Sequence, residues 1–410
     1  MYLKKINNAI PYLSAIYGIG FIAWLILSAK AAYFSFSDLP EFYTSAKLFA
    51  QHRALSIYDI NEFCKLENSF FPLMHNRSLG FFLPPPALLF LYPLALINVK
   101  ILPAIFGLFL TTCLFVSIAI LARIYSIPLH KLAYTIAYLS LCGFAYEPIR
   151  IAQLSTVMLL GLVFLIYALT RNKDFISGII LNCFWLKPQL IIPYAVFLMG
   201  ARRYKVFMWA GLITVLILAI LWFLYPGLTI YKAYQALISF SIEHSSYTQP
   251  ELNATIRGQL LRILPSFKTG IMQISSVIWL TTLICFFYLG HKLSKCKQFV
   301  EMGILLTTPL GILTSLHCYN YDLVFLLPSI LIIFKLIDKL SKLEFTIYFL
   351  YLIAFFMPIH VMLYYQYLLK GGTINPYFAL LLLYSLLCCK LAFKIEKFSL
   401  NINSLNNYVE

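Results

Sequence analysis

The chain has 410 residues, of which 61% are hydrophobic and only 11% are charged, and its formal net charge is +16. A soluble domain has roughly 45–50% apolar and about 25% charged residues. This chain therefore carries too few charges to cover a surface that faces water. Its basic residues recur as short clusters between apolar runs, as the positive-inside rule describes, and they form no single nucleic-acid-binding patch. The composition predicts a polytopic membrane protein and excludes a soluble enzyme.

The cysteines and short motifs exclude several kinds of chemistry. The nine cysteines lie mostly inside apolar runs and include no C-x-x-C pair, so we expect neither a disulfide framework nor a metal site. P-loop, H-E-x-x-H, G-x-S-x-G and G-x-G-x-x-G motifs are absent, so nucleotide hydrolysis and common hydrolase chemistry have no support. We expect no cofactor.

The first apolar run, residues 10–30, follows Lys4 and Lys5 and predicts the first membrane-spanning helix. Its length is about 20 residues, which is what a spanning helix needs. Ala29-Lys30-Ala31 resembles a signal-peptidase site, but the length of the run favours an uncleaved helix.

The remaining apolar runs bring the expected number of spanning helices to about twelve. They lie at 101–122, 131–147, 153–170, 174–187, 189–201, 206–225, 270–290, 300–317, 321–337, 344–363 and 376–393. Four prolines interrupt the run at 81–98, which predicts a short or re-entrant segment on the outer side. With the N-terminus inside, every short basic loop then falls on the inner side.

The polar stretches divide a single membrane-embedded unit, residues 1–397, into its loops. Residues 31–100 form a first outer loop with juxtamembrane helices, and 226–269 form a second outer loop. Residues 398–410 are a polar tail that we expect to fray.

Asp38 opens the first outer loop within Ser37-Asp38-Leu39-Pro40-Glu41-Phe42-Tyr43. Apolar residues follow at helical spacing, which predicts an amphipathic helix lying on the membrane surface. An Asp before a Pro in the first turn suits a helix N-cap. On this motif alone the cap is favoured over a catalytic carboxylate.

Several cations and polar residues fall at outer helix ends. Lys187-Pro188 separates two short apolar runs, so its amine either binds phosphate or extends to the membrane surface, and both interpretations are open. Arg150 and Gln153 are three residues apart, which predicts one face of a helix start. His317 ends a span, where a lone histidine is usually structural. Arg257 follows Asn253-Ala254-Thr255, a glycosylation sequon only in a protein that passes through the endoplasmic reticulum.

In chain order these segments resemble glycosyltransferase family 87, a family of multispanning GT-C enzymes that use polyprenyl-phosphate-linked sugars and are best known as alpha-mannosyltransferases. The matching segments are 37–43, 57–59, 82–88, 92–94, 151–155, 185–189 with 202–203, and the stretch from His317 to 326–328. Two positions depart from the family pattern. Ala152 stands where the family usually has glycine, and Asn253-Ala254-Thr255 matches a polar turn only loosely.

The resemblance implies an all-α, GT-C-like fold and transfer of a hexose, with mannose expected, from a polyprenyl-phosphate donor to a glycan or glycolipid acceptor. The outer position of the polar residues predicts an active site on the extracytoplasmic face. The lack of a targeting segment beyond the first span suits a multi-pass bacterial inner membrane protein, and an endoplasmic reticulum membrane is the alternative. The expected catalytic set is Asp38 as general base of an inverting reaction, with Glu41 and His317. The expected donor-phosphate set is Lys187, Arg150, Gln153 and Arg257.

Two other functions compete with this interpretation. A lipid-linked-sugar flippase or small-solute transporter would place charges in the middle of its spans rather than in outer loops. A non-catalytic partner subunit is the third interpretation. The outer position of the charges favours the enzyme.

Overall fold

The computed structural model describes residues 37–72, 80–128, 142–232, 235, 253–354 and 375–406. Within these ranges every element is a helix, and an isolated β-bridge joins Asn253 to Tyr319. The all-α prediction is confirmed for this part of the chain. The predicted first span at 10–30, its cleavage-like sequence and most of the span at 131–147 lie outside the described residues.

Four helical segments of the described chain are long and apolar enough to cross a membrane. They are Leu102–Ile124 (α5), Tyr204–Leu224 (α11), Pro265–Leu293, which contains η7 (Pro265–Phe267) and α14 (Lys268–Leu293), and Pro376–Ile395 at the start of α19. By length and composition, these segments support the prediction of a membrane protein. Helix α19 runs from Pro376 to Asn406, so the segment expected to fray at 398–406 continues a helix instead.

Other predicted spans are apolar helices of fewer residues. They are α8 (Ser155–Thr170), α9 (Asp174–Asn182) with η4 (Cys183–Leu186), α10 (Pro188–Gly200) and α15 (Phe299–Thr314). The predicted span at 321–337 is not one continuous α-helix. That stretch consists of η8 (Asn320–Leu326), α16 (Leu327–Lys335) and η9 (Ile337–Lys339), and Pro328 in the first turn of α16 marks the change because it has no N–H.

The segment between Ser37 and Leu102 folds as a group of short helices. These are α2 (Leu39–Ala50), η1 (Ala54–Tyr58), α3 (Ile60–Phe70), α4 (Pro86–Leu91) and η3 (Tyr92–Leu96). The proline-rich run is thus short, as its prolines predict. Nine of the twelve residues of α2 are buried, because α3, α4 and η3 pack around it. The expected helix is therefore present, and neighbouring helices cover most of its surface.

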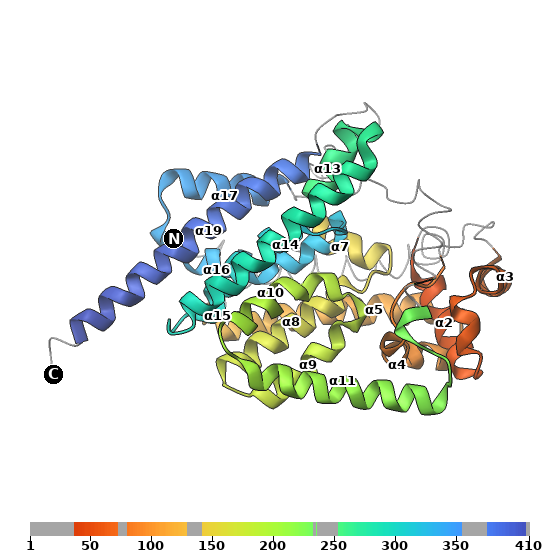
Figure 1. The fold of residues 1–410 in the computed structure, drawn as a ribbon. Coiled ribbons are helices and arrows are strands. Elements are labelled where there is room, and N and C mark those ends of the chain that lie inside the picture. Colours follow the sequence, from red (N-terminus) through yellow and green to blue (C-terminus); the bar gives the residue numbers. More distant parts are fainter. Residues whose placement is uncertain are drawn as a thin grey trace, which may run out of the picture.

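The longer helices form a bundle beside this group (Figure 1). Helix α15 packs against α10, α14 and α19, while α5 packs against α8 and α9 packs against α11. The remaining helices are α7 (Gly143–Arg150), α13 (Ile256–Ile263) and α17 (Lys342–Ala354). Helix α13 leads into α14, and α17 packs against α19.

Five helices end in the same turn without using glycine. His52, Ser126, Ala152, Asn172 and Arg202 all have positive φ. In each case the residue after it donates its N–H to a carbonyl five positions back, as in Arg53 to Leu48 at 2.8 Å. This is the Schellman motif, in which a left-handed residue satisfies the last carbonyls of a helix. One of these turns, at Ala152, positions the candidate active site.

Helices α10 and α14 approach closely through two glycines. A methyl group on Gly200 would overlap the carbonyl oxygen of Phe287, and one on Gly290 would overlap the carbonyl oxygen of Phe197. The two backbones are therefore in direct contact. Small residues are the usual means of such contact between membrane helices.

This contact predicts that Gly290→Ala destabilises the bundle, because the methyl group must push two backbones apart. We expect a loss of about 1–3 kcal/mol, as for other overpacked sites. Gly211 in α11 is the control, since a methyl group there would meet nothing within 4 Å. Gly211→Ala should gain roughly 0.5–1 kcal/mol from helix propensity. Thermal unfolding in detergent should move in opposite directions for the two variants; a Gly290→Ala variant as stable as Gly211→Ala would contradict the close contact.

Candidate active site

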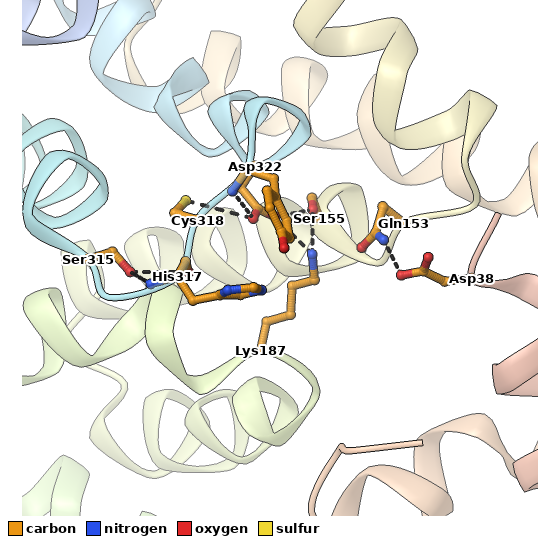
Figure 2. A network of polar contacts seen from close by, with 9 residues as sticks. Asp38, Gln153, Ser155, Lys187, Ser315, His317, Cys318 and Asp322 are labelled. Carbon is orange, nitrogen blue, oxygen red and sulfur yellow. Dashed lines mark hydrogen bonds and ion pairs between the residues drawn. The ribbon is translucent and has the colours of Figure 1, made fainter. Parts of the chain in front are cut away.

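Asp38 lies at the start of α2, but its side chain does not cap that helix. Its carboxylate forms no hydrogen bond to the backbone N–H groups of the first turn. Instead, the carboxylate accepts a hydrogen bond from the side-chain amide of Gln153 (Figure 2). The backbone N–H of Asp38 donates to the carbonyl of Ile151 at 3.2 Å. The start of α2 is thus fixed to the turn between α7 and α8, and the carboxylate is not occupied by capping.

The turn after α7 places Gln153 beside Asp38. Helix α7 ends at Arg150, and Ala152 follows with φ of 55°. The N–H of Gln153 donates to the carbonyl of Pro148 at 2.7 Å, which closes the Schellman turn. Ala152 therefore occupies the left-handed position where glycine is unstrained, which gives a physical reason for a glycine there. The prediction that Arg150 and Gln153 share a helix face is wrong, because this turn separates them.

Lys187 lies where η4 ends and α10 begins, as the Lys-Pro sequence predicts. Its Nζ donates to Asp322 Oδ1 at 2.8 Å and to Ser155 Oγ at 3.1 Å, and it lies 4.7 Å from the centre of the Tyr321 ring. The side chains of Lys187 and Asp322 are only 11% and 2% exposed. Lys187 is therefore a buried ion-pair partner, and the interpretation of an amine extended to the membrane surface is wrong.

Asp322 is the hub of the site, although no sequence motif pointed to this residue. Oδ1 accepts from Ser155 as well as from Lys187, and Oδ2 accepts from the N–H of Tyr319 at 3.2 Å and from the Cys318 thiol at 3.7 Å. These donors satisfy both oxygens of the buried carboxylate. The only sequence signal was an acidic residue just beyond the end of an apolar run.

His317 lies in the loop on the other side of this hub, and Arg257 contacts that loop from α13. Figure 2 shows His317 and Asp38 on opposite sides of Lys187. The His317 ring packs edge-on against Tyr319 at 4.5 Å, and burial lowers the pKa of His317 to about 4, so the imidazole is neutral at pH 7. Arg257, in the first turn of α13, donates to the carbonyl of Leu316 at 2.8 Å and steadies the same loop.

Other acidic and basic candidates have partners outside this cluster. Arg150 pairs with Glu147 at 2.7 Å, so its charge is already engaged. Asp59 caps α3 by accepting from the N–H groups of Asn61 and Glu62 at 3.1 and 3.2 Å.

Glu41 lies one turn along α2 from Asp38. Burial and then the carboxylates of Asp38 and Glu67 raise the pKa of Glu41 well above its usual range.

The electrostatic environment of Asp38 suits proton transfer near neutral pH. Burial raises the pKa of Asp38 to about 6, against the opposing effects of Lys187 and the Gln153 hydrogen bond. A free aspartate has a pKa of about 3.9 and is a weak base. A general base works best when its pKa lies near the operating pH. At pH 7 Asp38 is therefore mainly ionised and more basic than an exposed carboxylate.

The Asn253-Ala254-Thr255 sequence has a structural role. Asn253 and Thr255 are buried. Asn253 Oδ1 accepts from the Thr255 N–H at 3.1 Å, and Thr255 Oγ1 accepts from the Gly258 N–H at 3.1 Å, which caps α13. The folded chain does not offer this asparagine for glycosylation.

The buried ion pair predicts an asymmetric response to mutation. Lys187→Met leaves Asp322 buried without its cation, which should cost about 3–5 kcal/mol of stability. Adding Asp322→Asn removes the unpaired charge and should restore much of that loss. Lys205→Met, at an exposed lysine of α11, is the control and should change stability by less than about 0.5 kcal/mol. Denaturant titration in detergent measures the stability of all three variants. A Lys187→Met variant as stable as the wild type would show that the ion pair does not hold the site together.

One comparison with known proteins identifies a family. The family model described as "Glycosyltransferase family 87" matches residues 81–315, which is more than half of the chain. Lys187, Gln153, Arg150 and Arg257 fall inside the matched segment, whereas Asp38, Glu41, His317 and Asp322 fall outside it. No curated protein and no solved structure matches the chain.

Proposed function

Because the chain belongs to glycosyltransferase family 87, we propose that it transfers a hexose from a polyprenyl-phosphate donor to a hydroxyl group of a glycan or glycolipid. The observation that carries this proposal is the Asp38 carboxylate, which is free of capping and is held by Gln153 close to the Lys187–Asp322 pair. Membership of the family makes the protein a glycosyltransferase, so a sugar donor and an acceptor exist. The donor, the acceptor and the residue roles are the proposal.

Asp38 acts as the general base. Its ionised carboxylate takes the proton of the acceptor hydroxyl while that oxygen attacks the anomeric carbon. The bond between the anomeric carbon and the phosphate oxygen breaks, and the phosphate leaves with the electron pair. One displacement inverts the anomeric configuration. A phosphate leaving group needs positive charge rather than a proton, so no acid partner is required.

Lys187 supplies that positive charge. It is the cation that acts on Asp38 through space, and its amine is fixed by Asp322 and Ser155. An ammonium held in this way needs no reorganisation when charge develops on the leaving phosphate. Arg257 is the next candidate because it contacts the adjoining loop from α13. Arg150 is the weaker candidate because Glu147 already engages its charge.

The remaining details of the donor and the membrane follow from the family resemblance and from charge. Mannose is the proposed sugar. The positive-inside rule places the short basic loops on the inner side, and the Asp38 cluster then faces the extracytoplasmic side of a bacterial inner membrane. We propose a GT-C-like bundle of about twelve spanning helices, in which the four long segments and the shorter apolar helices are joined by segments outside the described residues.

The competing transporter function receives less support from the site. Asp38, Ser155 and Lys187 lie at the starts of α2, α8 and α10, and Asp322 lies in the first turn of η8. A transporter would bind its substrate near the midplane of the bilayer, whereas the charge rule puts these helix ends on the outer side. This outer position supports the proposed enzyme over a transporter.

The proposal is tested by Asp38→Asn. Asparagine keeps the size and can still accept the Gln153 hydrogen bond, but it cannot take a proton at neutral pH. We expect transfer to fall by about 10²–10⁴-fold. Thermal stability should be unchanged or higher, because burial already opposes the charge of Asp38. The measurement is the rate of sugar transfer together with the unfolding temperature.

Glu41→Gln is the matched control, since it removes a carboxylate one turn along the same helix and should reduce transfer much less. In the wild type, the rate should also fall about tenfold per pH unit below pH 6, where the Asp38 carboxyl becomes protonated. Wild-type rates in Asp38→Asn would assign the proton transfer to another group.

A further inference from the structure

A cavity lies at the end of the bundle away from Asp38. Its volume is about 260 Å³, and it is lined by residues that include Tyr125 after α5, Gln298 and Glu301 at the start of α15, and Lys335 at the end of α16. Helix α15 leads from this cavity to Ser315 and His317 at the site. Its 16 residues span about 24 Å. The cavity is therefore separate from the candidate active site.

The lining of the cavity combines positive charge with apolar surface. Three lysines line it, Lys335, Lys339 and Lys394, against one carboxylate, Glu301. The rest is mainly aliphatic, with leucine and isoleucine from α16 and α19. Lys394 is held in place by the Lys339 carbonyl at 2.9 Å and by Glu344 at 3.5 Å. A net positive lining beside aliphatic side chains suits an anion that carries apolar chains.

Two residues of the lining each carry a buried polar atom that lacks a hydrogen-bond partner within the described residues. These atoms are the hydroxyl of Tyr125, whose side chain is only 1% exposed, and Oε1 of Gln298. A buried polar group without a partner is costly, so such atoms call for a ligand. The Tyr125 hydroxyl can donate to a phosphate oxygen, while Gln298 and Glu301 can accept from a hydroxyl.

We propose that this cavity binds the headgroup of an anionic phospholipid, with its phosphate on the lysines and Tyr125 and its hydroxyl groups toward Gln298 and Glu301. The cavity holds a headgroup but not the acyl chains, which lie outside against the apolar helices. Phosphatidylglycerol has this chemistry: a net negative charge and free hydroxyl groups. Phosphatidylcholine has the phosphate but neither a net charge nor a donor, and free glycerol phosphate lacks the chains.

The test is thermal unfolding of the purified full chain in detergent with each of these three compounds added. Phosphatidylglycerol should raise the unfolding temperature in a saturable way, and phosphatidylcholine and glycerol phosphate should not. Equal protection by phosphatidylcholine would overturn the proposal. Equal protection by glycerol phosphate would assign the cavity to a soluble anion and would also overturn it.

Two variants locate the effect in the cavity. Lys335→Gln with Lys339→Gln should weaken the apparent affinity for phosphatidylglycerol about 30-fold, since each lysine near an anionic lipid contributes roughly fivefold. Lys295→Gln with Lys297→Gln is the matched control, because it removes the same charge from exposed positions between α14 and α15 that do not line the cavity. An equal loss in both double variants would mean unspecific attraction to the lipid.

Tyr125→Phe distinguishes binding from folding. It removes only the hydroxyl, which has no partner in the described structure, so the variant without lipid should be at least as stable as the wild type. Its affinity for phosphatidylglycerol should fall about tenfold, as for loss of a hydrogen bond to a charged group. Unchanged affinity would remove Tyr125 from the site and contradict the proposed headgroup orientation.

Discussion

The buried ion pair between Lys187 and Asp322 is the interaction on which the candidate site depends. It joins the start of α10 to η8, and Ser155 adds the start of α8. Three segments far apart in the chain thus meet at one pair of charges. Each charge is too costly to bury alone, so the pair forms only when all three segments are in place. Gln153, which holds Asp38, precedes Ser155 on the same turn, so these contacts also fix the geometry around Asp38.

This arrangement gives Lys187 a different character from that of a lone cation. Its charge is balanced by Asp322, so the ammonium is not a free cation in the site without substrate. A donor phosphate would then share an ammonium whose position is already fixed. Asp38 is in the opposite situation: burial disfavours its charged form and raises its pKa to about 6. The site therefore combines a stabilised cation with a destabilised carboxylate, and that combination suits proton transfer beside a leaving phosphate.

The sequence predicted what depends on composition and local chain chemistry. The long apolar helices, the short proline-rich segment and the break at Lys187-Pro188 are all local signals. Pairings between distant residues had no such signal: Lys187 and Asp322 are 135 positions apart, and Gln153 and Asp38 are 115 apart. The burial of α2 was missed because the helices that cover it, α3 and α4, leave no trace in its own periodicity. The left-handed turn at Ala152 was missed because alanine rarely adopts it.

The central claim is transfer of a sugar from a lipid phosphate by single displacement. Purified protein should be given a radiolabelled polyprenyl-phosphate hexose or the corresponding sugar nucleotide, with membrane glycolipids as acceptors, and the anomeric configuration of the product should be determined. The account predicts transfer from the polyprenyl phosphate with inverted configuration and none from the nucleotide. Transfer from the nucleotide, or a product that retains the donor configuration, would contradict it.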